Sequence, residues 1–102
     1  MNAIENDVRA LVDKELAAAN ERFPQFHSAH EGWAVILEEV IETEVEMKTV
    51  RESIEGMFRS VINNADAKWA AQKIEYAAIH AACEAIQVAA MCRKFMGMEA
   101  GQ

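Results

Sequence analysis

The sequence predicts an all-α protein, in which an N-terminal helix precedes a long antiparallel helical hairpin that forms a bundle by homo-oligomerisation. Apolar residues recur with a helical period over most of the 102 residues. One proline and four glycines are too few for the many turns of an all-β chain. Two of the periodic segments are about 30 residues long, or some 45 Å, so a second copy is needed to complete their core.

The composition is that of one folded domain, residues 1–102, and it excludes several partners. Apolar residues make up 52% and charged residues 26%, which is typical of a globular chain. The formal net charge of −7 argues against nucleic acid and against a membrane surface as partners. No run approaches the roughly 20 apolar residues of a membrane span. The first residues do not resemble a signal peptide, so we expect a cytoplasmic protein with reduced cysteines.

The first two helices have clear boundaries in the sequence. We expect the first over residues 3–22, ending before Pro24, because the residue before a proline avoids the α region. The second should cover residues 29–62. It starts at a capping box, in which Ser28 accepts a hydrogen bond from a first-turn amide and Glu31 reaches back. The apolar stripe of the first helix consists of Ile4, Val8, Leu11, Val12, Leu16 and Ala19.

The third helix is expected over residues 66–96. The Asn-Asn pair at 63–64 indicates the turn of the hairpin, and Asp66 is a candidate N-cap. Gly97 is suited to the left-handed position that follows a helix end. We expect residues 98–102 to form a frayed tail.

An acidic stretch in the second helix is the first functional signal. Residues 31–46 contain six glutamates and neither lysine nor arginine. Four of them share one arc of the helix about 100° wide, namely Glu38, Glu39, Glu42 and Glu46. Like charges this close repel one another. A solvated acidic face is one explanation. The other is a divalent cation such as Mg²⁺, because core-forming Leu37 and Ile41 flank the arc and carboxylates beside a core are usually paired or metal-bound.

A single acid in the third helix matches this stretch. Glu84 is the only acid of the alanine-rich stretch 77–90, where small side chains let a neighbouring helix approach closely. It is either paired across that contact or a metal ligand. A hairpin that turns at residues 63–64 places Glu42, 21 residues before the turn, level with Glu84, 20 residues after it. The sequence therefore predicts that the two acidic positions face each other.

Together these residues resemble the signature EExxE … ExxD of the MazG-like all-α nucleotide pyrophosphohydrolases. The matching blocks are Glu38-Glu39-Val-Ile-Glu42 and Glu84-Ala-Ile-Gln87. Their flanks, residues 27–39 and 84–95, are similar to the small MazG-like proteins often encoded by phages and prophages. The resemblance covers residues 26–96.

The resemblance implies a helical bundle, a homodimer or homotetramer, that hydrolyses a nucleoside triphosphate to a monophosphate and pyrophosphate. The implied cofactor is Mg²⁺, with Mn²⁺ as an alternative, and a water activated by metal or carboxylate attacks phosphorus. Carried over by position, Glu39, Glu42 and Glu84 are metal ligands, and Glu38 is a further ligand or the base that orients the water. Gln87 replaces the family aspartate and offers an uncharged amide oxygen.

Two departures from the signature leave an alternative open. Gln87 brings no charge, so it should lower the affinity for Mg²⁺, and the segment between Glu42 and Glu84 is longer than in the usual motif. The alternative is a catalytically inactive MazG-like bundle that binds nucleotide or metal, or serves as an oligomeric scaffold.

Three residues are candidates for substrate binding, each with a structural alternative. His30 either contacts phosphate or makes local hydrogen bonds near the helix cap, as does His27. Trp33 either stacks on a base or anchors a core or interface. Lys94 either neutralises the leaving pyrophosphate or complements the helix C-terminus.

Other enzyme classes lack their required residues. No histidine has a glutamate three positions before it, as a ferritin-like di-iron site needs. There is no glycine-rich loop followed by Lys-Ser or Lys-Thr, as a P-loop needs. Both cysteines lie in apolar surroundings that do not activate a thiol.

Overall fold

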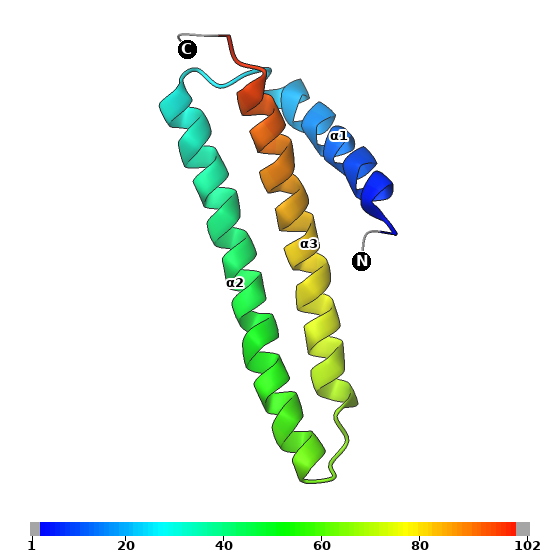
Figure 1. Cartoon of the computed structure of the whole chain (residues 1–102). Coiled ribbons are helices and arrows are strands. Elements are labelled where there is room, and N and C mark those ends of the chain that lie inside the picture. Colours follow the sequence, from blue (N-terminus) through cyan, green and yellow to red (C-terminus); the bar gives the residue numbers. More distant parts are fainter. Residues whose placement is uncertain (1–2, 100–102) are drawn as a thin grey trace.

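The protein is an antiparallel helical hairpin with a shorter helix packed against one end of it. The computed structural model describes residues 3–99, which form three helices and no strand: α1 (Glu5–Arg22), α2 (Ala29–Ile62) and α3 (Lys68–Met96). α2 and α3 pack along each other, and α1 packs on α3 (Figure 1). The predicted all-α fold with its hairpin is confirmed. Residues 100–102 of the predicted frayed tail lie outside the described residues.

The molecule is long and thin. It extends over 59 × 27 × 23 Å with a radius of gyration of 17.5 Å, whereas a compact domain of 100 residues has about 13 Å. Among residues 3–99, no helix has the length and apolar character needed to cross a membrane.

The capping box at the start of α2 forms, but the return hydrogen bond of Glu31 involves the amide one residue before the predicted one. The Ser28 hydroxyl accepts a hydrogen bond from the Glu31 amide at 3.1 Å, as predicted. The Glu31 carboxylate reaches back to the amide of His27, at 3.3 Å, and not to that of Ser28. α1 ends as predicted, with Phe23 in the extended conformation before Pro24.

The turn between α2 and α3 is a Schellman motif. Asn64 adopts a left-handed conformation with φ 55°. The amide of Ala65 donates to the carbonyl of Ser60 at 2.9 Å, and the amide of Asn64 to that of Val61 at 3.1 Å, the two bonds that define the motif. Asparagine tolerates this conformation better than most residues. This explains why the Asn-Asn pair at 63–64 indicates a turn.

The start of α3 and the conformation of the residue that follows it differ from the prediction. The helix begins at Lys68, two residues late, because Asp66 lies outside it and its carboxylate accepts from the Lys68 amide at 2.9 Å. The helix does end at Met96. However, Gly97 is the capping residue itself with φ −83°, so the expected left-handed glycine is not formed.

Few side chains of the described residues are fully buried. The buried apolar set consists of Val12, Phe26, Ala77, Ala81 and Ala90. Three of these are alanines of α3, so the predicted close approach of helices at small residues is confirmed.

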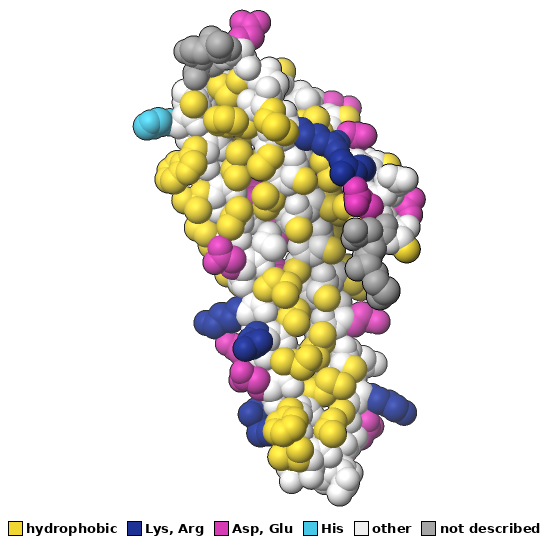
Figure 2. Space-filling view, in the orientation of Figure 1, with side chains coloured by type: hydrophobic (Ala, Val, Ile, Leu, Met, Phe, Trp, Pro, Cys, Tyr) yellow, Lys and Arg dark blue, Asp and Glu magenta, His cyan; other side chains and the backbone are white. Residues whose placement is uncertain are grey.

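Large apolar side chains remain outside this core. Hydrophobic groups run along the whole hairpin on the face turned to the viewer in Figure 2. One row on α2, which we name the outer stripe, is half-buried to exposed and consists of Trp33, Leu37, Val40, Met47, Ile54, Phe58 and Val61. A single copy of the chain leaves this stripe without a covering element within residues 3–99.

Candidate metal centre

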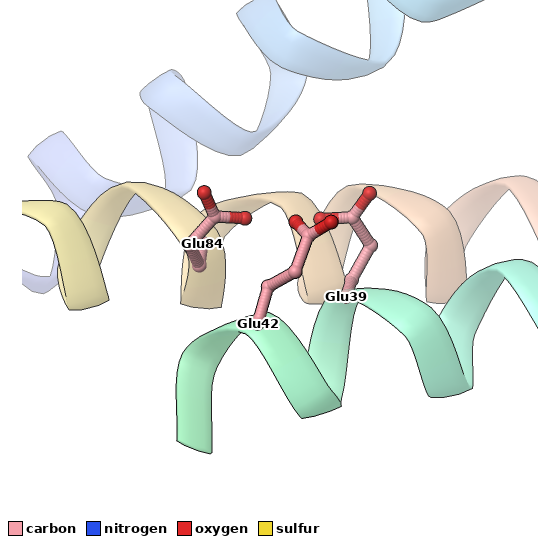
Figure 3. Close-up of side chains that lie close together, drawn as sticks. All are labelled: Glu39, Glu42 and Glu84. Atoms are coloured by element: carbon pink, nitrogen blue, oxygen red, sulfur yellow. The ribbon is translucent and has the colours of Figure 1, made fainter. Parts of the chain in front are cut away.

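Three glutamates from two helices converge at the middle of the hairpin. Glu39 and Glu42 lie one turn apart on α2, and Glu84 extends from α3 toward them (Figure 3). One carboxylate oxygen from each lies within 4.8 Å of the other two. The structure therefore brings together three of the four residues predicted as metal ligands. We call these three residues the acidic cluster.

The acidic cluster contains buried oxygens that lack a partner. Glu39 and Glu84 are half-buried, while Glu42 is exposed. The Oε2 atoms of Glu39 and Glu84 are shielded from solvent and accept no hydrogen bond from the described residues. No salt bridge joins the cluster to a basic side chain between residues 3 and 99. Since unpaired buried carboxylates are costly, this donor set fits a hard divalent cation, which prefers carboxylate oxygens.

The electrostatics of the acidic cluster shift two pKa values upward. Burial raises the pKa of the Glu39 carboxyl to about 7, and the negative charges of Glu42 and Glu84 add to the effect. Hydrogen bonding with Glu84 raises the pKa of the Glu42 carboxyl, with burial as the next cause. Without a cation, these carboxyls hold protons more tightly than isolated ones. A bound cation would displace those protons.

Glu38 does not join the acidic cluster. Its side chain is exposed on α2, and it is not among the residues whose oxygens gather within 4.8 Å. Adjacent helix positions point about 100° apart, so Glu38 is directed away from the place where Glu39 points. Its expected role as a further ligand or as the base therefore has no support from its position.

A cleft of about 510 Å³ opens beside the acidic cluster. It lies between α1 and the hairpin, and both Glu39 and Gln87 form part of its wall. Gln87 is half-buried on α3, one turn beyond Glu84, as predicted from its spacing. The complete lining is Ala19, Arg22, Phe23, Phe26, His27, Glu31, Val35, Glu39, Gln87, Met91 and Lys94. The cleft thus combines apolar walls with basic side chains next to the acids.

Lys94 is on the wall of this cleft but is held by the fold. Its side chain is 6% exposed, and its ammonium donates to the Phe23 carbonyl and lies 4.9 Å from the centre of the Phe26 ring. The neighbouring Arg93 pairs with Asp13 of α1. Both cations therefore attach α1 and the following loop to α3.

The two remaining substrate-binding candidates lie elsewhere. His30 and Trp33 are exposed and line a different hollow, of about 480 Å³, with Ala29 and Phe95. The structure does not bring them to the acidic cluster, because they occupy another side of α2. By contrast, His27 lines the cleft, and its Nδ1 lies 3.0 Å from Glu31. This contact lowers the pKa of the Glu31 carboxyl.

Sequence reasoning missed the contribution of α1. Asn20 of α1 has a buried Oδ1 without a hydrogen-bond partner among the described residues, and Arg22 lines the cleft. Asn20 lies four residues after Leu16, so a polar residue on the apolar stripe of α1 was the available signal.

No protein-family model, curated protein or solved structure matches this chain.

Proposed function

We propose that the protein is an Mg²⁺-dependent, MazG-like nucleoside triphosphate pyrophosphohydrolase, acting as a homo-oligomer. The observation that carries this proposal is the acidic cluster, with its buried unpartnered oxygens, beside a cleft lined by apolar and basic side chains. Carboxylates that hold a divalent cation next to such a cleft are suited to bind a charged phosphate chain and an attached nucleoside.

Each part of the site has a task in this reaction. Glu39, Glu42 and Glu84 would hold Mg²⁺, with the amide oxygen of Gln87 as an additional donor. The bound Mg²⁺ would supply charge neutralisation on the phosphates and a more acidic water. Attack of water on the α-phosphorus breaks the bond to the bridging oxygen of the β-phosphate, and pyrophosphate leaves. Arg22, which lines the cleft, is the cation we assign to the phosphate chain.

A second candidate function is favoured by two specific observations. Gln87 stands where the resembling family has an aspartate, and Glu38 lies outside the acidic cluster. The first leaves the cation with one charged ligand fewer, and the second leaves the attacking water without the base that the resemblance implies. A protein with these changes would bind metal and nucleotide without turnover.

The test measures pyrophosphate release from a panel of NTPs and dNTPs with Mg²⁺ or Mn²⁺. Glu42→Gln should abolish release, because it removes one carboxylate of the cluster. The matched control is Glu55→Gln, at an exposed glutamate of the same helix outside the cluster, which should keep it. Binding of metal and nucleotide without release would favour the second candidate. Absence of both binding and release would overturn both.

A further inference from the structure

Two opposite charges without partners, Glu44 and Arg51, lie in line with the outer stripe of α2. When these two positions are added, the residues of the row follow one another in alternating steps of four and three, which is the spacing of a helix–helix seam. Both are exposed, and neither forms an ion pair within residues 3–99. Charges within an apolar seam determine which helix pairs with it, and in which register.

The chain exposes more surface than a compact monomer of its size. Its accessible surface is 7746 Å², whereas a folded monomer of 11.4 kDa is expected to expose about 5,800 Å². The surplus of about 2,000 Å² exceeds the roughly 800 Å² that each partner buries in a standard interface. The outer stripe contributes to this surplus, with Trp33 64% and Phe58 62% exposed.

The charges of the stripe are complementary to themselves under two-fold symmetry. Glu44 and Arg51 are equally distant, along α2, from the midpoint between positions 47 and 48. A two-fold axis that runs at a right angle to α2 at this level, and passes between the two copies of α2, makes them antiparallel. It places Glu44 of each copy level with Arg51 of the other, and Leu37 level with Phe58. The same symmetry thus pairs opposite charges at the centre and large apolar groups toward the ends.

We propose that a second copy of this chain covers the outer stripe, with the two α2 helices antiparallel and two Glu44–Arg51 ion pairs between the copies. A second copy is the occupant because the stripe complements itself, as an isologous interface requires. This interface is independent of whether the acidic cluster is catalytic.

Charge reversal tests this arrangement by sedimentation equilibrium, which gives the mass of the assembly. The wild type should sediment as a dimer or a larger even assembly. Glu44→Arg and Arg51→Glu should each weaken association about tenfold or more, because like charges then meet at the two-fold axis. The double variant should associate like the wild type, and so should an equimolar mixture of the two single variants. Glu15→Arg, at an exposed glutamate of α1, makes the same charge change away from α2 and should have no effect.

Three results would overturn the proposal. The first is a wild type that stays monomeric at tens of micromolar, and the second is an assembly that both reversals leave intact. The third is loss of assembly that neither the double variant nor the mixture restores, although circular dichroism shows the single variants to be helical. The readout is mass, so a failure here is distinct from absence of pyrophosphate release.

Discussion

A carboxylate oxygen of Glu42 on α2 and one of Glu84 on α3 lie within 4.8 Å of each other, although 41 residues separate them in the sequence. The Schellman turn around Asn64 sets this relationship, because it determines which turns of the two helices are level. Two carboxylates held this close repel when both are ionised. Cation binding and proton binding are therefore the two ways in which the folded protein relieves the repulsion.

Mg²⁺ should raise the melting temperature of the wild type. A ligand that binds only the folded state stabilises it by about 2.7 kcal/mol at 100 times its Kd. Glu84→Gln should lose most of this gain, and Glu55→Gln should keep it. Differential scanning fluorimetry with and without Mg²⁺ measures both. An equal gain in Glu84→Gln and wild type would count against Glu84 as a ligand.

Without metal, the contribution of Glu39 to stability should fall as pH rises. Its pKa is about 7 in the folded protein and near its ordinary value of 4.5 when unfolded, so the folded state binds the proton more tightly. The contribution is fully present below about pH 4.5 and is lost as pH rises to 7 and above. Urea unfolding from pH 4 to 8 in EDTA measures it. Glu39→Gln should remove this pH-dependent contribution to the free energy of unfolding. A variant with the same pH profile as the wild type would contradict the raised pKa of Glu39.

Gln87→Asp should tighten Mg²⁺ binding, on the order of tenfold, because it adds a charged oxygen donor one turn from Glu84. Isothermal titration with Mg²⁺ measures the change. Gln72→Asp makes the same chemical change at an exposed site of α3 and serves as the control. Equal affinities in wild type and Gln87→Asp would show that position 87 does not contact the cation.

Lys94→Met should destabilise the fold by about 1–3 kcal/mol, because the Phe23 carbonyl loses its donor. The exposed Lys73→Met should change stability by less than about 0.5 kcal/mol. Chemical denaturation of both variants makes the comparison. If Lys94→Met leaves the stability unchanged, this ammonium does not hold the loop, and Lys94 is again a candidate for contact with phosphate.

The two helical glycines of α2 should respond in opposite directions to alanine. A Cβ at Gly32 would lie 2.6 Å from a ring atom of Phe95 and 2.9 Å from one of Phe26, whereas at Gly56 the nearest atom is 3.8 Å away. Gly56→Ala should therefore stabilise by up to about 1 kcal/mol through helix propensity. Gly32→Ala should destabilise by about 1–3 kcal/mol through overpacking. Thermal melts of the two variants, recorded side by side, test the contrast.

The sequence alone determined the helices and the pairing of the acids. Pro24, the Ser28 cap and the asparagine turn are local signals, and each acts through the backbone of a few neighbouring residues. Once the turn is known, the rise per residue of a helix places Glu42 level with Glu84 by counting. Family resemblance added the expected role of these acids, which the experiments above test.

Only the tertiary structure decided what surrounds the acids. The position of α1 on α3 depends on Arg93 with Asp13 and Lys94 with Phe23, contacts between residues about 70–80 positions apart. No periodicity or cap encodes such contacts, because they arise from packing between distant segments. The cleft beside Glu39 lies between the segments that these contacts join. Packing of the helices likewise buries Glu39, which raises its pKa, and leaves Glu38 in solvent although the two are adjacent in the sequence.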